Sequence, residues 1–152
     1  MKPWIPLRVA SVVSVLYAAG HGSGFPWMAP GGPENNALVE QLKSYRFDVM
    51  GASRTIWDFH IGFGLIISLD LVVLAVTLWL LASLAKRTGS APLRPLIATI
   101  GFGFVANAIL VGRFFFVVPL AMAVVIVVCL GLAFIFASRS EQNRSTLPVS
   151  VT

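Results

Sequence analysis

Apolar residues in this chain are gathered into four long blocks separated by polar connections. The blocks cover residues of about 4–20, 59–84, 93–111 and 118–137. A helix needs about 20 mostly apolar residues to cross a hydrocarbon core, and short connections place consecutive helices antiparallel. The pattern therefore predicts an all-α fold, an integral membrane four-helix antiparallel bundle that forms a single membrane domain over residues 1–152.

The first block, WIPLRVASVVSVLYAAG, is the shortest and carries Arg8. A basic residue ahead of a short apolar run that ends in small residues also describes a signal peptide. Pro3, Trp4 and Pro6 instead suit an anchor at the membrane interface. We interpret this block as a retained span.

The longest connection lies between the first and second blocks and opens with HGSGFPWMAPGGP, whose glycines and prolines oppose regular structure. After it, Leu38, Leu42, Tyr45 and Val49 are spaced by four, three and four residues. This spacing predicts an amphipathic interfacial helix over residues of about 34–50. The helix would be either a lid on the end of the bundle or a gate over a ligand pocket.

Composition agrees with a membrane protein, because 57% of the residues are hydrophobic and only 11% are charged. The net charge is +5, but the basic residues are spread over several connections and form no patch, which argues against nucleic-acid binding. The single Cys129 excludes an internal disulfide, a CxxC redox pair and a thiolate metal cluster.

The distribution of basic residues predicts the orientation. With the N-terminus in the cytoplasm, seven basic residues fall on that side, namely Lys2, Arg8, Lys86, Arg87, Arg94, Arg139 and Arg144. Four fall on the other side, namely Lys43, Arg46, Arg54 and Arg113. We therefore expect both termini in the cytoplasm and the long connection outside it. Separately, the polar sequence of residues 140–152 predicts a mobile tail.

Polar residues inside the blocks recur at helical spacing. Thr99, Gly103 and Asn107 repeat every four residues in the third block, forming a small and polar stripe that permits close helix approach. Ser11, Ser14 and His21 share a stripe in the first block, with spacings of three and seven residues.

Asp70 lies near the middle of the second block. An ionised carboxylate at the bilayer centre costs at least ~2.5–3.5 kcal/mol, so Asp70 should be protonated or turned inward. We expect it to lie among Ser11 or Ser14, Thr99 and Asn107. It would make a structural hydrogen bond between helices, or handle a proton, an ion or a substrate.

Histidines stand at two helix ends. His21 ends the first block and His60 begins the second, so antiparallel packing would bring both to the same membrane face. Together they could bind a metal ion or serve as axial ligands of a haem, with Asp58 as a further carboxylate. The alternative is helix-end packing and hydrogen bonding. The candidate catalytic residues are His21, Asp58, His60 and Asp70.

Arginines near the same rim suggest a second kind of contact. Arg54 and Arg113 could each pair with Asp58, or hold an anionic headgroup or a substrate carboxylate. Trp57 fits an aromatic belt, and Ser53 or Thr55 could cap a helix. The candidate substrate-binding residues are Arg54, Trp57, Asn107 and Arg113.

The stretches SRTIWDFHIGFGL, LRPLIA and ANAILVGRFFFVVP resemble a group of small bacterial membrane proteins with four spans and no assigned activity. The resemblance implies a bacterial origin, an inner-membrane location and the same bundle. The layout is also similar to that of DoxX-like proteins, which are associated with respiratory membranes and quinol chemistry. That second likeness is one of architecture alone.

Two classes of function fit these features. The first is a non-catalytic membrane component, either an accessory subunit of a larger membrane complex, which docks through its apolar fourth helix, or a lipid- or quinone-binding component. The partners would be the bilayer, other membrane subunits or further copies of the chain. The alternative is a membrane enzyme that acts on a lipophilic substrate at the outer face through His21, His60 and Asp58. The sequence requires no cofactor, although a metal, haem or quinone would be compatible with it.

Overall fold

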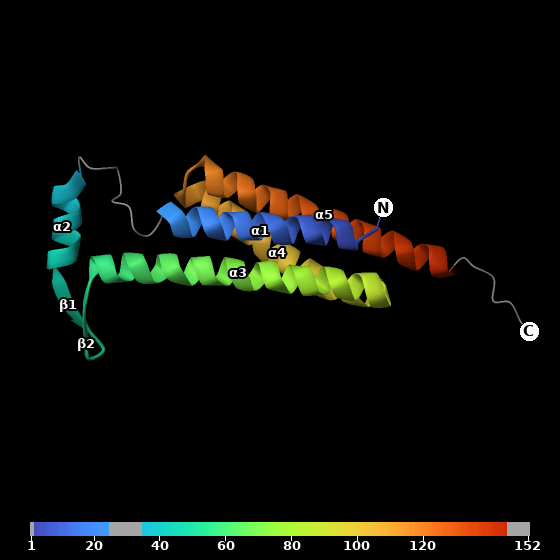
Figure 1. Ribbon diagram of the computed structural model, residues 1–152, viewed down its shortest axis with the longest axis horizontal. Coiled ribbons are helices and arrows are strands. Elements are labelled where there is room, and N and C mark those ends of the chain that lie inside the picture. The colour runs from blue at the N-terminus through green and yellow to red at the C-terminus, as the bar shows by residue number, and fades with distance from the viewer. Residues whose placement is uncertain (1, 25–34, 146–152) are drawn as a thin grey trace, which may run out of the picture. The chain divides into compact units, whose positions relative to one another are not determined.

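The computed structural model describes residues 2–24 and 35–145, with side chains described as far as residue 139. Its elements follow one another along the chain as labelled in Figure 1. They are α1 (Trp4–Gly24), α2 (Asn36–Ser44), β1 (Arg46–Val49), β2 (Ala52–Thr55), α3 (Ile56–Thr88), the short 3₁₀ helix η2 (Ala91–Leu93), α4 (Arg94–Phe114) and α5 (Val117–Ser145). The chain is mostly helical, as predicted.

Three helical segments are long and apolar enough to cross a membrane, which agrees with the prediction of a membrane protein. They are Ile56–Thr88, Ala91–Phe114 and Val117–Arg139. The first helix, α1, has the same length as α4, 21 residues. Arg8 interrupts its apolar run, whereas the two arginines of α4, Arg94 and Arg113, lie at the ends of that helix.

The contacts divide the chain into two compact units. One comprises residues 1–15 and 73–152, and therefore the first half of α1, the second half of α3, η2, α4 and α5. The other comprises residues 16–72, with the end of α1, α2, the two strands and the first half of α3.

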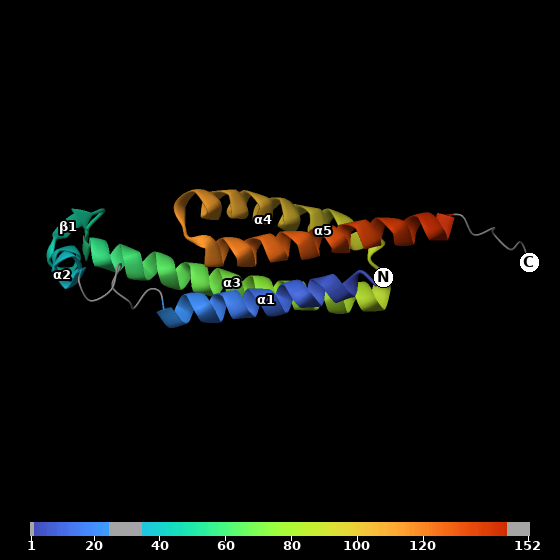
Figure 2. The same ribbon diagram turned by 90° about the horizontal axis from the view of Figure 1, so that it is seen from above.

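In the first unit, α4 and α5 lie side by side and are joined only by Phe115 and Phe116 (Figure 2). At Gly112 of α4 a Cβ atom would lie 3.5 Å from the Leu120 side chain of α5, an ordinary van der Waals distance. Small and branched side chains fill the unit's core. Its buried residues include Leu7, Ala10, Leu78, Ala82, Ile97, Ala123, Ile126, Leu130 and Ala133.

Polar contacts link α1 to α3 in the same unit. The Ser11 hydroxyl donates a hydrogen bond to the Ala75 carbonyl oxygen, at 2.6 Å. The Arg8 guanidinium donates to Ser83 Oγ at 3.0 Å and lies 3.4 Å from the centroid of the Trp79 ring. A hydroxyl and an aromatic face therefore compensate the charge of Arg8 within an apolar segment.

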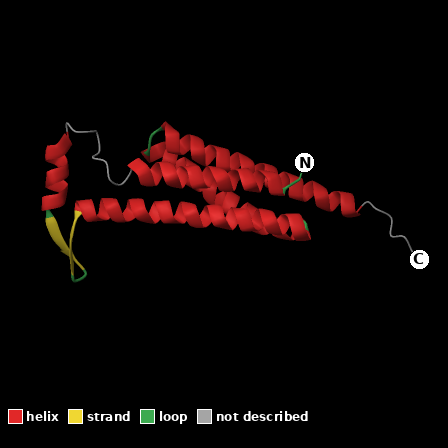
Figure 3. Cartoon of the chain, viewed as in Figure 1, coloured by secondary structure: helices red, strands yellow, loops and turns green. Residues whose placement is uncertain are grey.

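In the second unit, the prediction of a helix over residues 34–50 is wrong in its second half. Helix α2 ends at Ser44, and β1 and β2 then form an antiparallel hairpin, drawn as yellow strands in Figure 3. The pairing runs from Arg46 opposite Thr55 to Val49 opposite Ala52.

Two local features explain the hairpin. Tyr45, Phe47 and Val49 alternate with polar Arg46 and Asp48, which is the period of a strand. The two residues of the turn, Met50 and Gly51, have φ angles of 48° and 83°. Positive φ at both positions is typical of the type I′ turn that matches the twist of paired strands. Gly51 therefore closes a hairpin instead of ending a helix.

Two boundaries also differ from the prediction. Helix α1 continues to Gly24, and α5 continues to Ser145. Residues 140–145 are therefore helical, contrary to the predicted mobile tail. Glutamate, glutamine and arginine in this stretch are good helix formers. The remainder of the predicted tail, residues 146–152, and residues 25–34 of the predicted irregular segment lie outside the described residues.

Candidate functional site

Asp70 lies on the exposed surface of α3. It is 14 residues from Ile56 and 18 from Thr88, so apolar helix extends about 20 Å or more on either side. Within residues 2–24 and 35–139, no side chain or backbone group makes a hydrogen bond or ion pair with the Asp70 carboxylate. The exposed side chain contradicts the prediction that Asp70 turns inward.

The expected partners are engaged elsewhere. Ser14 donates to the Ala10 carbonyl oxygen at 2.8 Å, and Thr99 donates to the Pro95 carbonyl oxygen at 2.9 Å. These are bonds to the residue four positions earlier in the same helix, which serine and threonine make readily. Because each hydroxyl satisfies itself locally, nothing drives these groups to gather around Asp70.

The polar stripe of α4 is uncovered. Thr99, Gly103 and Asn107 are all exposed, and a Cβ atom built at Gly103 would have no atom within 4 Å. Only 11% of the most apolar part of this helical segment is buried in the described chain. Among the described residues of its own unit, the stripe therefore provides no contact to a neighbouring helix, although its residue types suit one.

His21 is hydrogen bonded to Ser68, a residue that the sequence analysis did not single out. The distance between His21 Nδ1 and Ser68 Oγ is 3.0 Å. Ser68 Oγ also donates to the Gly64 carbonyl oxygen at 3.0 Å. A hydroxyl has only one proton to donate. Because Ser68 donates it to the Gly64 carbonyl oxygen, the imidazole donates from Nδ1 and Ser68 Oγ accepts. The pair links α1 to α3 and does not activate a nucleophile. The available signal was the small pair Gly64 and Ser68, spaced by four residues.

His60 has a different neighbour. Its ring stacks on the Trp57 indole, with centroids 5.0 Å apart and planes at 28°. His60 also precedes Ser68 by eight residues, which is about 12 Å along a helix. The two imidazoles therefore have separate partners, which argues against one metal ion or substrate between His21 and His60. Among the described residues, no group of three or more His, Cys, Asp or Glu side chains could hold a metal ion.

Asp58 caps α3 together with Thr55. The Thr55 backbone N–H donates to Asp58 Oδ2 at 2.8 Å, and the Asp58 backbone N–H donates to Thr55 Oγ1 at 3.0 Å. This reciprocal pair is a capping box that satisfies two backbone donors at the helix start. It confirms Thr55 as a cap and gives Asp58 a structural role.

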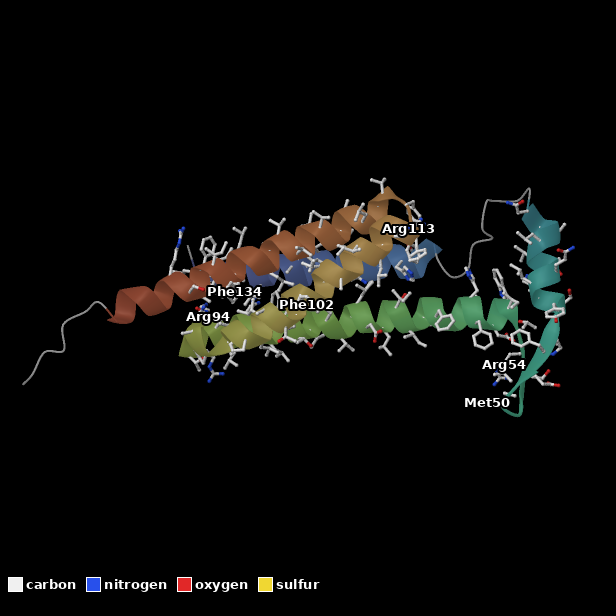
Figure 4. The ribbon with its side chains drawn as sticks, turned by 180° about the vertical axis from the view of Figure 1, so that it is seen from behind. Met50, Arg54, Arg94, Phe102, Arg113 and Phe134 are labelled. Carbon is white, nitrogen blue, oxygen red and sulfur yellow. The ribbon has the colours of Figure 1, made fainter. Side chains whose placement is uncertain are left out.

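Arg54 does not form the predicted ion pair with Asp58. Its guanidinium donates instead to the Ser53 carbonyl oxygen at 3.0 Å, and in the described part of the chain the ion pair within 4.0 Å is between Lys43 and Glu40. Arg54 belongs to β2 of the hairpin and is labelled in Figure 4. A shallow groove of about 250 Å³ adjoins it, lined by Arg54, Asp58, Phe59, Gly62, Phe63 and Ile66.

The remaining candidates have local aromatic neighbours. Trp57 lies under the Lys43 ammonium, which is 5.3 Å from its ring centroid. The Arg113 guanidinium lies 5.7 Å from the Phe114 ring centroid, at the opposite end of α4 from Arg94 (Figure 4). Both contacts suit residues that anchor a helix end near a membrane surface.

Comparisons with protein-family models, with curated proteins and with solved structures found no match to this chain. The site must therefore be interpreted from its own geometry. Between the helices of each unit, Ser11 is hydrogen bonded to a backbone carbonyl and His21 to Ser68, whereas Asp70 and the Thr99–Gly103–Asn107 stripe are exposed.

Proposed function

We propose that the protein is a non-catalytic integral membrane component that acts as an accessory subunit of a larger membrane complex. The observation that carries the proposal is the exposed Asp70 within an apolar helix of 33 residues. A carboxylate that faces acyl chains costs at least ~2.5–3.5 kcal/mol. A partner that covers Asp70 would remove most of this cost.

The partner is a membrane helix of another protein, with a lysine or arginine at the depth of Asp70. Ionisable groups inside membranes are stabilised by pairing with one another. The exposed stripe of Thr99, Gly103 and Asn107 supports the proposal independently, because small and polar residues let membrane helices approach closely. The contact surfaces are thus on α3 and α4, not on the apolar α5 that the sequence favoured.

We further propose four antiparallel spans, with α1 as the fourth. The contacts between α1 and α3 in the first unit support this layout, since Trp4 is near Lys86, Arg8 near Ser83 and Ser11 near Ala75. The residue number rises along one helix as it falls along the other. The excess of basic residues at the termini and the turn after α3 favours cytoplasmic termini. The resemblance described above favours a bacterial inner membrane.

Asp70→Asn tests the subunit proposal. The protein is purified from its native membrane in a mild detergent, and the partners that remain bound are measured by mass spectrometry. Removing one member of a buried ion pair leaves the other charge uncompensated, which costs 2 kcal/mol or more. We expect association with the partner to weaken at least about thirtyfold, because 1.4 kcal/mol corresponds to a factor of ten.

Asp48→Asn is the matched control, because Asp48 is an exposed acid in β1 and the change in net charge is the same. This variant should retain the partner. An isolated wild-type monomer without any partner would contradict the proposal. So would equal losses for the two variants, or a self-associated dimer that survives Asp70→Asn.

A further inference from the structure

A second cavity lies in the first unit, at the start of α1 and the end of α3. Its volume is about 250 Å³. It is lined by Lys2, Pro3, Trp4, Ala85, Lys86, Gly89, Ser90, Ala91 and Pro92.

The charge around this cavity is positive and uncompensated. Lys2 and Lys86 both line it, and no aspartate or glutamate occurs in residues 2–15 or 73–139, the part of this unit whose side chains are described. The Lys86 ammonium lies 5.4 Å from the centroid of the Trp4 ring. That contact holds Lys86 at the cavity by a cation–π interaction and leaves its charge available to an anion.

The remaining lining identifies the kind of anion. Pro3, Trp4, Ala85, Ala91 and Pro92 present apolar atoms beside the two ammonium groups. The cavity also lies at the last turn of α3, where its apolar sequence gives way to Lys86 and Arg87. A phosphate attached to acyl chains meets both requirements, because the chains continue along the apolar helix while the phosphate contacts the lysines.

We propose that this cavity binds the phosphate of an anionic phospholipid headgroup. Lys2 and Lys86 provide the charge, and Trp4 positions Lys86. The site does not depend on Asp70 or on the partner proposed above, so either proposal can fail without the other.

The test measures phospholipid binding to the full-length protein in a neutral detergent by native mass spectrometry. The probes are phosphatidylglycerol, phosphatidylcholine with the same acyl chains, and inorganic phosphate. We expect the wild type to prefer phosphatidylglycerol. Lys86→Gln should weaken this binding roughly fivefold, the effect of one basic residue near an anionic lipid surface. Lys2→Gln should act in the same direction.

Arg87→Gln is the matched control. It removes the same charge at the next position, yet Arg87 does not line the cavity. Its binding should stay close to that of the wild type, and circular dichroism should show the same helicity for all variants. Equal losses for Lys86→Gln and Arg87→Gln would overturn the site in favour of diffuse attraction. Equal binding of the two lipids, or displacement of phosphatidylglycerol by millimolar inorganic phosphate, would overturn the lipid assignment.

Discussion

A hydroxyl in an apolar helix can bond to its own helix or to a neighbour, and this chain contains both cases three residues apart. Ser14 donates to the Ala10 carbonyl oxygen of α1 itself, whereas Ser11 donates to the Ala75 carbonyl oxygen of α3. Both side chains are buried. Only the second kind of bond is lost when two helices separate, so these two serines should contribute differently to the stability of the fold.

Ser11→Ala should therefore destabilise the protein more than Ser14→Ala. Hydrogen bonds between membrane helices contribute about 0.6 kcal/mol on average and up to about 1.7 kcal/mol. We expect a loss in that range for Ser11→Ala, and a smaller change for Ser14→Ala, whose bond is local to one helix. Unfolding of both variants in detergent, followed by circular dichroism against denaturant, measures the difference. Equal losses would show that the bond to Ala75 does not stabilise the helix pair.

At the scale of elements, the sequence predicts helices well where the apolar blocks are long, and poorly where a short segment has two periods. Leu38, Leu42, Tyr45 and Val49 fit a helix, yet Tyr45 and Val49 also belong to the alternating pattern of β1. The turn at Met50 and Gly51 decides between them. Methionine at positive φ is uncommon, so the turn carried no strong sequence signal beyond its glycine.

Glycine substitutions on the two faces of α4 should have different effects on folding stability and on association. A side chain at Gly112 would meet Leu120 of α5 at 3.5 Å, whereas one at Gly103 would meet nothing within 4 Å. A Cβ atom alone fits at Gly112, but the longer side chain of Gly112→Leu should press on Leu120 and destabilise the fold by about 1 kcal/mol, the low end for an overpacked contact. Gly103→Leu should leave the folding stability unchanged and reduce association with the partner. Unfolding curves and co-purification measure the two effects, and a stable Gly103→Leu variant that keeps its full partner content would contradict a contact through this stripe.

At the scale of the whole molecule, the sequence could predict which segments are helical but not which way each one faces. Helix α3 is apolar on nearly all sides, so hydropathy does not specify its rotation about its own axis. The inward orientation of Asp70 was therefore inferred only from the free-energy cost of a carboxylate that faces lipid. The exposed side chain contradicts that inference. Contacts between helices decide such rotations. Contacts between helices also decide that His21 is hydrogen bonded to Ser68 and is not paired with His60.

The exposed carboxylate then has consequences for the assembly. A soluble surface tolerates an exposed aspartate, but this one lies within an apolar helix about 50 Å long. A helix of another subunit that covered Asp70 would remove the free-energy cost of exposing the carboxylate to acyl chains. The same helix would also cover Ile66, one turn away.

Photocrosslinking from the two sides of α3 tests this central claim most directly. A photoreactive amino acid is placed at Ile66, about 40° from Asp70 around the helix, or at Val72, about 160° from Asp70. The two residues are similarly exposed, at 55% and 48%, so exposure alone should not separate them. We predict that crosslinking in intact membranes joins the Ile66 variant to a second protein and that the Val72 variant gives mainly lipid adducts. Lipid adducts alone from both positions would contradict a docked partner at Asp70.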